Sequence, residues 1–478
     1  MKYLSTRGEV TGLTFEEALC SGFVQDGGML LPEEVPVISE DKLKSWSGLS
    51  YRDLAKKITP KFVAEDEIPR EDLFGLIDAA VMKINHPETA PVARLPSGLN
   101  ILELFHGITW AFKDLPLSFV GLFLSYFLAK RKKHLTLLTA TSGDTGSAAI
   151  ESVRGQEWID IICMFPLGRC SRIQELQMTT VIDDNVHVYR GEGTSDDFDM
   201  LMKACFKDVE FARKHNLGTI NSFNWARIMM QIVHYFHAYL QVCHVCGEEV
   251  EIVIPTGGCG NLVAGCIARK MGLPIKIVCA VNKNDIVARI IDKGDFSPER
   301  AQMSLAPAMD IQMILNMERV WYLFSDGDYQ LVNQLMTQFE KTGKTQVPES
   351  LKQKIQLAVS TFVVSDDMIK KTMRKCWDEN NYLVCPHTAT AVAYHYHKLE
   401  QPSLQDKLPQ ICIATASPAK FQEAVIAAGL ELPPNDAVLK IESLPTKCED
   451  FQKGCDWNTV LRQKVEEISN RFLARNVS

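Results

Sequence analysis

Residues 250–278 read VEIVIPTGGCGNLVAGCIARKMGLPIKIV. The apolar runs VEIVIP and IKIV are typical of buried parallel strands, and the segment between them has the composition of a helix. Gly257, Gly258 and Gly260 connect the first strand to this helix, and their lack of side chains lets the backbone fold closely around an anion at the helix N-terminus. Gly272 ends the helix. The stretch therefore predicts a unit of a doubly wound α/β fold.

A second junction of the same kind lies at residues 134–152, HLTLLTATSGDTGSAAIES. We expect the strand to end near Ala140 and the helix to begin at Ser147, with small polar residues between them that form a second anion site. Neither junction is a known nucleotide motif, because no Lys-Ser/Thr follows the glycines and GGCGN lacks the GxGxxG spacing. A single glycine turn is commonly only structural. Two such loops instead favour a ligand that carries both a phosphate and a carboxylate.

Short apolar runs continue to alternate with helical segments from about residue 90 onward. The runs are LTLLTA (135–140), IDIICMF (159–165), IKIVCAV (275–281), which extends the stretch quoted above, and ICIATA (411–416). Such β-branched runs between helices predict buried parallel strands. Residues 13–86 have a helical pattern broken by prolines, and residues 326–378 are polar and predicted to be helical.

These patterns divide the chain into three predicted parts. We expect an α-rich N-terminal domain over residues 1–90 and an α/β body over residues 91–425. The remaining residues, 426–478, form a C-terminal extension that ends in an amphipathic helix of unknown use.

The composition excludes several classes of protein. With 478 residues, 46% of them hydrophobic and 23% charged, the chain has the composition of an ordinary globular protein. Its 51 Lys and Arg against 59 Asp and Glu leave a net charge of −8, which argues against a nucleic-acid partner. The 14 cysteines are scattered, with no secretory signal before them, which predicts free thiols and a cytoplasmic location.

Residues 115–129, LPLSFVGLFLSYFLA, imitate a membrane span. As a helix they would be only about 22 Å long, whereas the hydrocarbon core of a bilayer is about 30 Å thick. We therefore predict a buried helix here and no membrane association.

HYFHAYLQVCHVC superficially resembles a zinc site, because it contains His234, His237, Cys243 and Cys246. The cysteine spacing suits zinc, but the histidines lie in an apolar helical run only a few residues earlier. Buried helix residues are the better interpretation, so no metal is predicted.

The segment FHGITWAFKDLPL (105–117) contains Lys113, next to Phe112 and just before the predicted buried helix. Partial burial lowers the pKa of a lysine and suits it to Schiff-base chemistry. By itself, however, this context is more typical of a surface lysine beside Asp114.

A family resemblance favours the first interpretation. HGITWAFKD resembles the cofactor-lysine motif of threonine synthases, which are fold-type II (tryptophan synthase β-like) pyridoxal phosphate enzymes. Further segments resemble the same family in the expected order: YLSTRGE (3–9), GFVQDGGMLLP (22–32), TSGDTGSAA (141–149), SRIQELQMT (171–179), NSFNWARI (221–228), PTGGCGN (255–261), AMDIQ (308–312), CPHTATAV (385–392) and TASPAKF (415–421). The resemblance implies two doubly wound α/β lobes plus the α-rich N-terminal domain, enclosing pyridoxal 5'-phosphate.

Site roles carry over by this resemblance. Lys113 is expected to bind the cofactor as a Schiff base and to shuttle the substrate α-proton. The cofactor phosphate is expected to be held by Gly257, Gly258, Cys259, Gly260 and Asn261, with Thr415 facing the pyridine nitrogen. The substrate α-carboxylate is expected to be bound by Thr141, Ser142, Gly143, Asp144 and Thr145. Further expected substrate contacts are Thr109, Asn224 and Arg227. His387 is interpreted as a packed or hydrogen-bonded residue rather than the base.

Two departures from the family pattern bear on the reaction. The phosphate loop commonly reads GNFGN, where this chain has Gly258 and Cys259, and STAHPAKF is replaced by ATASPAKF with Ala414 and Ser417. Compared with the family pattern, this chain lacks side-chain bulk and an amide group near the cofactor. Their loss would reduce control over the step in which water adds to the substrate.

We therefore expect a pyridoxal phosphate-dependent carbon–oxygen lyase acting on phosphates, a chemistry that the resemblance associates with one branch of the family. It would convert O-phosphohomoserine or O-phosphothreonine to 2-oxobutanoate, ammonia and phosphate. Alternatives are a threonine synthase, a dehydratase of the unphosphorylated amino acid, and a non-catalytic binding protein on this scaffold. The expected partner is a small phosphorylated amino acid, and the expected state is a monomer or homodimer.

Overall fold

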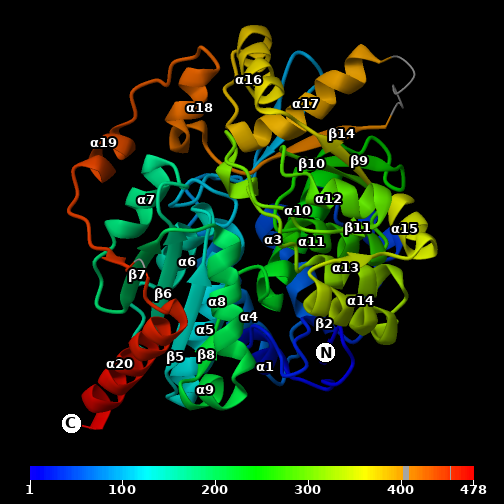
Figure 1. Cartoon of the computed structure of the whole chain (residues 1–478). Coiled ribbons are helices and arrows are strands. Elements are labelled where there is room, and N and C mark those ends of the chain that lie inside the picture. The colour runs from blue at the N-terminus through cyan, green and yellow to red at the C-terminus, as the bar shows by residue number, and fades with distance from the viewer. Residues whose placement is uncertain (402–407, 453, 478) are drawn as a thin grey trace.

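The computed structural model describes residues 1–401, 408–452 and 454–477 (Figure 1). Two mainly parallel sheets with helices packed against them make up most of the molecule. This arrangement confirms the two-lobed, doubly wound α/β architecture that the sequence predicts.

The N-terminal segment is a helical layer on the body. β1 (Tyr3–Ser5) pairs antiparallel with β2 (Leu30–Pro32). The helical elements are α1 (Phe15–Cys20), α2 (Glu40–Lys44), α3 (Tyr51–Ile58), η1 (Thr59–Lys61) and α4 (Arg70–Val81). α3 packs against α10 (Trp225–Val242), and α1 and α4 pack against α5 (Asp114–Arg131), so two central helices of the body anchor this layer.

The first lobe contains a five-stranded sheet of order β15-β7-β6-β5-β8, in which all neighbours are parallel. Its strands are β5 (Leu135–Ala140), β6 (Ile159–Pro166), β7 (Val186–Gly191), β8 (Leu217–Gly218) and β15 (Glu449–Asp450). The helices of this part of the chain are α6 (Asp144–Val153), α7 (Arg172–Thr179), α8 (Ser195–Lys207) and α9 (Val209–Lys214). The strands predicted at 135–140 and 159–165 are confirmed, and α6 begins three residues before the expected Ser147.

The second lobe contains a six-stranded sheet of order β13-β10-β9-β14-β4-β3, parallel except for the β3–β4 pair. Its strands are β3 (Val92–Arg94), β4 (Asn100–Glu103), β9 (Val250–Pro255), β10 (Ile275–Val281), β13 (Val359–Val363) and β14 (Gln410–Ala414). The three apolar runs predicted as strands in this region are therefore confirmed.

The remaining elements follow β9 in the chain. They are α11 (Gly260–Lys270), α12 (Ile286–Ala288), η2 (Arg289–Lys293), β11 (Asp295–Phe296), η3 (Pro307–Met309), α13 (Met317–Phe324), α14 (Tyr329–Thr342), β12 (Thr345–Gln346), α15 (Glu349–Gln356), α16 (Asp366–Asn380), α17 (Pro386–Glu400), η5 (Pro418–Lys420), α18 (Gln422–Ala427), α19 (Asp436–Glu442) and α20 (Trp457–Val477).

Helix α5 contains the stretch that imitates a membrane span. Most of its side chains are buried, and it packs against α1, α4, α6 and α10. Lys130 and Arg131 lie in its last turn, where they favourably meet the negative end of the helix dipole. The prediction of a buried helix is confirmed, and among the described residues no helix is long and apolar enough to cross a bilayer.

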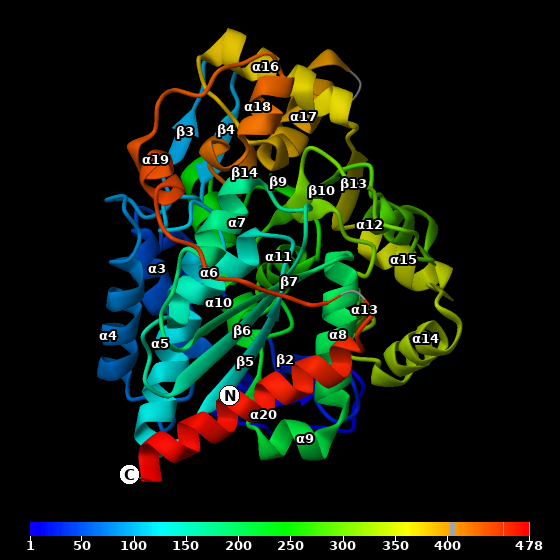
Figure 2. The ribbon, with the colours of Figure 1, turned by 60° about the vertical axis from the view of Figure 1, so that its left-hand side comes forward.

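Two regions differ from expectation or extend it. Residues 326–378, predicted to be helical, also contain β12 and β13. Because β13 is an edge strand with partly exposed side chains, it lacks the continuous apolar run of the central strands. The C-terminal segment returns to the first lobe, where β15 pairs with β7 and α20 packs against α8 and β5 (Figure 2).

Candidate active site

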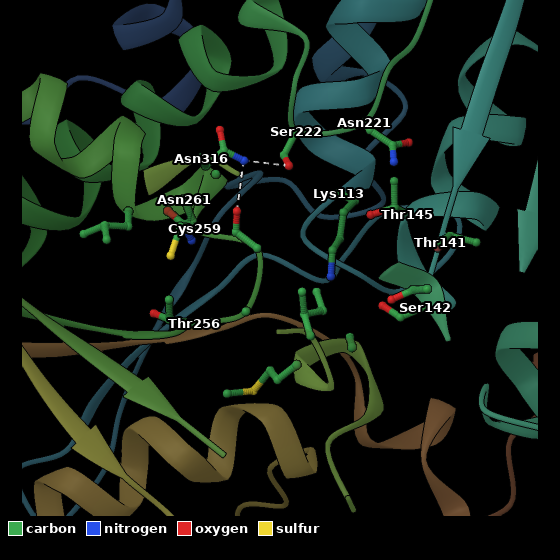
Figure 3. A pocket seen from close by; sticks show the side chains of 18 of the residues that line it. Lys113, Thr141, Ser142, Thr145, Asn221, Ser222, Thr256, Cys259, Asn261 and Asn316 are labelled. Atoms are coloured by element: carbon green, nitrogen blue, oxygen red, sulfur yellow. Dashed lines mark hydrogen bonds between the residues drawn. The ribbon is translucent and has the colours of Figure 1, made fainter. Parts of the chain in front are cut away.

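A pocket lies where the carboxyl ends of β5 and β9 meet, which is the usual position of ligand sites in open α/β sheets. Figure 3 shows Lys113 pointing into it, between the glycine loop and the loop that follows β5. Eleven of the predicted site residues line this pocket: Lys113, Thr141, Ser142, Thr145, Arg227, Gly257, Gly258, Cys259, Gly260, Asn261 and Thr415. The structure thus brings together residues that are up to 302 positions apart in the chain.

The glycine loop is pressed against its neighbours. A Cβ atom at Gly260 would lie 2.9 Å from the Cβ of Ser222, and one at Gly257 would lie 3.1 Å from the main-chain oxygen of Ala308. Cys259 adopts a left-handed conformation, with φ of 59°, just before α11 begins. The loop backbone is therefore held at the N-terminus of an eleven-residue helix, where free N–H groups favour an anion.

Side chains from two helical segments fix this loop. Asn316 donates through Nδ2 to the Gly258 oxygen and to Ser222 Oγ, both at 2.9 Å (Figure 3). The Tyr235 hydroxyl lies 2.8 Å from Asn261 Oδ1. Asn261 Nδ2 is then left buried and without a hydrogen-bond partner among the described residues. An unpaired donor beside a helix N-terminus fits the phosphate of the expected cofactor.

Lys113 lies directly before α5, and its amine is in an environment that lowers its pKa. Nζ lies 3.2 Å from Asp144 Oδ2 and 4.5 Å from the centre of the Phe112 ring. Burial, followed by the positive charges of Arg227 and Lys420, lowers the pKa of Lys113, although Asp144 opposes this. A lysine with a lowered pKa is suited to bonding with an aldehyde.

The loop after β5 divides into residues that face the pocket and residues that shape it. Thr141, Ser142 and Thr145 line the pocket, whereas Gly143 and Asp144 do not. Gly143 has φ of 130°, and a Cβ there would lie 2.4 Å from the side chain of Gln174. Asp144, predicted to bind a substrate carboxylate, instead accepts hydrogen bonds from Lys113 and from Gln174 Nε2.

Arg227 extends from α10 to the opposite wall of the pocket. Its guanidinium is buried and donates to Ile220 O and Thr145 Oγ1, both at 3.3 Å. Its Nε atom has no partner, and it forms no ion pair with a carboxylate of the described residues. Burial lowers its pKa to about 10, so the group remains a cation at neutral pH. An unpaired buried cation in a pocket is suited to an anionic substrate.

Two of the expected substrate contacts lie away from the pocket. Asn224 caps α10 by accepting from Ala226 N, and its Nδ2 donates to Leu19 O and Thr219 O. The Thr109 hydroxyl donates to Asp114 Oδ1 at 2.6 Å. These side chains are occupied by internal hydrogen bonds and do not line the pocket, which favours a structural role for both.

Thr415 lines the pocket, and its backbone fixes the lysine segment. Its main-chain oxygen accepts from Phe112 N at 2.7 Å, so the end of β14 holds the residue next to Lys113.

His387 also lines the pocket; its Nε2 accepts from Ala308 N at 3.0 Å, and burial lowers its pKa to about 3. A neutral, hydrogen-bonded histidine agrees with the interpretation made from the sequence.

Four polar pocket residues have no role predicted from the sequence. Asn221 and Ser222 lie within NSFNWARI, so this motif is the signal that could have found them, whereas Asn316 and Asp199 lie outside the segments that resemble the family. The histidines weighed as metal ligands are hydrogen-bonded inside the protein: His234 lies 2.9 Å from the Tyr51 hydroxyl and His237 lies 2.8 Å from Ala90 O.

Comparisons with known proteins agree with this geometry. The family model described as "Threonine synthase N terminus" matches residues 2–81, "Pyridoxal-phosphate dependent enzyme" matches residues 99–415, and "Threonine synthase, C-terminal" matches residues 388–463. The chain is 50% identical to Threonine synthase-like 2 of Rattus norvegicus over 99% of this chain and 98% of that protein. It is 38% identical to the threonine synthase of Schizosaccharomyces pombe, over 89% of this chain and 88% of that protein.

Comparison with solved structures indicates the same family. The pyridoxal phosphate-bound threonine synthase from Brucella melitensis matches with a TM-score of 0.88 and 34% identity, over 98% of this chain and 99% of that one. The threonine synthase from yeast matches with a TM-score of 0.88 and 35% identity, over 99% of each chain. Pyridoxal 5'-phosphate is therefore the cofactor that the pocket accommodates. The chain belongs to the threonine synthase family of fold-type II, pyridoxal phosphate-dependent enzymes.

Proposed function

We propose that this protein is a phospho-lyase that eliminates phosphate from O-phosphohomoserine and O-phosphothreonine and releases 2-oxobutanoate and ammonia. The observation that carries the proposal is the buried Arg227 guanidinium, which lines the pocket of Lys113 and has no carboxylate partner among the described residues. A buried cation is costly unless an anion neutralises it. A substrate that brings its own phosphate and carboxylate supplies that anion.

Each group in the pocket has a role in this scheme. Bound pyridoxal 5'-phosphate supplies an electron sink that acidifies the substrate Cα–H. The amides of the glycine loop and Asn261 Nδ2 would hold the cofactor phosphate, and Thr415, which lines the pocket, would lie beside the cofactor. Lys113 would bind the cofactor, and its Nζ, once free, would accept the Cα proton of the substrate. Phe112, Phe223 and Met309 line the pocket and limit the entry of bulk water.

The C–O bond to the phosphate breaks, and its electron pair leaves with inorganic phosphate, whose charge Arg227 and the hydroxyls of Ser142 and Thr145 stabilise. For O-phosphothreonine, loss of the Cα proton is sufficient. O-phosphohomoserine also loses a Cβ proton as phosphate leaves from Cγ, and one of these two protons is then returned to Cγ, so that both substrates give the same unsaturated amino acid. The unsaturated amino acid then takes up one water and separates into 2-oxobutanoate and ammonia. Addition of that water at Cβ would instead give threonine.

Space at Gly258 supports release over water addition. A Cβ at Gly258 would have its nearest neighbours at 3.9 Å, in Ser222 Oγ, and 4.0 Å, in Ile311 Cδ1. A side chain could therefore begin at this position without a clash at its Cβ, and the absence of the asparagine of the family pattern leaves space beside the loop. Without a fixed amide, a water molecule near the loop has one fewer group to orient it.

The test is a product analysis of the purified, cofactor-loaded protein. We would incubate it with O-phosphohomoserine, O-phosphothreonine, homoserine and threonine, and quantify phosphate, 2-oxobutanoate, ammonia and threonine. Equal yields of phosphate and 2-oxobutanoate from a phosphorylated substrate would support the lyase. Threonine as the main product would identify a threonine synthase, and ammonia from unphosphorylated threonine would identify a dehydratase. No turnover by fully loaded protein would favour a binding protein.

A further inference from the structure

Lys420 is a fully buried lysine close to the pocket that the proposed chemistry does not use. It ends η5, in the TASPAKF segment, and its exposed fraction is 0%. Its ammonium lies 2.9 Å from Asp144 Oδ1 and donates to the main-chain oxygen of Thr109 at 2.7 Å. A buried cation is retained only where nearby groups compensate its charge.

Asp144 therefore lies between two lysines. Its Oδ2 atom lies 3.2 Å from Lys113 Nζ, while its Oδ1 atom is shared by Lys420 and by Gln174 Nε2, each at 2.9 Å. Burial alone would raise the pKa of Asp144, but the charges of Lys420 and Lys113 outweigh this effect and hold it below its usual range. The carboxylate is thus ionised, and two ammonium groups compete for one negative charge.

Other charged groups around this cluster do not replace Lys420. Arg227 faces Lys113 as a second cation, and His387 is neutral because burial lowers its pKa to about 3. Asp114 lies near Lys420, but its carboxylate accepts from Thr109 N at 2.9 Å and Thr109 Oγ1 at 2.6 Å, and burial raises its pKa to about 6. Among the described residues, Asp144 forms ion pairs with Lys113 and Lys420 alone.

Charge balance in this poorly hydrated site determines how readily Lys113 loses its proton. With Lys420 present, Asp144 keeps a counter-ion even when Lys113 loses its proton, so the deprotonated state of Lys113 leaves a neutral Lys420–Asp144 pair. Without Lys420, the ionised Asp144 could be neutralised only by a protonated Lys113. An amine bonds to an aldehyde only when its lone pair is free, because that pair forms the new C–N bond.

We propose that Lys420 is a positioning residue that acts as the permanent counter-ion of Asp144 and thereby increases the share of Lys113 present as a reactive neutral amine. This inference rests on the assignment of Lys113 as the cofactor lysine. A purely structural Lys420 would stabilise the fold but leave the titration of Lys113 unchanged.

The test measures that titration directly in the full chain stripped of cofactor. The rate at which an amine-reactive acylating reagent modifies Lys113 is followed against pH by peptide mass spectrometry. In Lys420→Met we expect the midpoint to rise by about one unit or more, so that modification at neutral pH slows roughly tenfold. Thr109 O keeps a donor in this variant, because Gln177 Nε2 lies 3.2 Å away.

Lys398→Met is the matched control. Lys398 is also buried and forms an ion pair of 2.9 Å with Glu251, but it does not line the pocket. Its loss should lower stability without moving the Lys113 midpoint. Lys420→Arg, which keeps the charge, should stay near the wild-type midpoint. If Lys420→Met does not fold, Lys420→Gln carries the test, because it removes the charge but keeps a hydrogen-bond donor.

A Lys113 midpoint unchanged in a folded Lys420→Met or Lys420→Gln variant would overturn the proposal. This experiment contains neither substrate nor cofactor, so its outcome is independent of the lyase reaction. The cofactor assignment is tested separately by the visible absorbance of the lysine-bound cofactor, which Lys113→Ala should abolish. A protein that keeps this absorbance in Lys113→Ala would refute the cofactor assignment, whatever the titration shows.

Discussion

Substituting two glycines of the same loop should affect cofactor binding very differently. In Gly260→Ala the added Cβ would lie 2.9 Å from Ser222 Cβ and 3.3 Å from Ile228 Cδ1. Ser222 Cβ is bonded to the backbone, so it cannot rotate away. The loop or the 222 segment must therefore shift. In Gly258→Ala the nearest atoms would be 3.9 and 4.0 Å away, which is ordinary van der Waals contact.

The magnitude follows from the cost of overpacking. Forcing an additional carbon into a filled space costs about 1–3 kcal/mol. If the loop moves to relieve the clash, that cost appears as lost affinity for the cofactor phosphate. The dissociation constant of pyridoxal 5'-phosphate should then rise roughly 5- to 150-fold in Gly260→Ala. In Gly258→Ala it should change by no more than about twofold.

The assay is titration of the cofactor-free variants with pyridoxal 5'-phosphate, followed by visible absorbance. Thermal unfolding of the cofactor-free proteins is measured in parallel. The loss of chain entropy in the unfolded state is common to both Gly→Ala substitutions, so it cancels in their comparison. Equal and unimpaired affinity in both variants would refute the reasoning that close contact with Ser222 fixes the position of the loop.

Four further predictions follow from the site and its surroundings. Arg227→Gln should lower kcat/KM for the phosphorylated substrate roughly 10- to 150-fold, because Arg227 is proposed to bind the phosphate both before and while the C–O bond breaks; steady-state kinetics showing an unchanged kcat/KM would contradict its role. Asn316→Ala removes the donor to the Gly258 oxygen and should weaken cofactor affinity roughly 2- to 10-fold in the same titration. Gly258→Asn should increase the ratio of threonine to 2-oxobutanoate among the products, and an unchanged ratio would argue against the role of the open space. Burial lowers the pKa of His234 to about 3 in the folded protein. Between about pH 6.5, the ordinary pKa of a histidine, and pH 3, this side chain therefore binds a proton in the unfolded chain but not in the folded protein. Stability is then fully present above about pH 6.5 and is lost as the pH falls toward 3, by about 2 kcal/mol at pH 5; urea unfolding at pH 7.5 and pH 5 should show a smaller difference in His234→Gln than in the wild-type protein.

Much of the architecture was predictable because its signals are local. The apolar runs at 135–140, 159–165, 250–255, 275–281 and 411–416 all form strands, since central parallel strands are buried on both faces and need continuous apolar sequence. The glycine loop was visible for a similar reason, because close contacts at Gly257 and Gly260 leave little room for a side chain there. Strand β13 was not predicted, because an edge strand can expose one face and so loses that pattern.

For the site residues, too, the features with a local sequence signal were predictable and the others were not. The sequence by itself determined which segments reach the pocket, because the motifs around Lys113, Gly257 and Thr141 each end a strand or begin a helix. Only the tertiary structure decided what their side chains meet. Asp144 was expected to face the substrate, yet it lies between Lys113 and Lys420, whose Cα atoms belong to segments far apart in the chain. Backbone conformation follows largely from local sequence, whereas the partner of a buried charge depends on which remote segment packs against it.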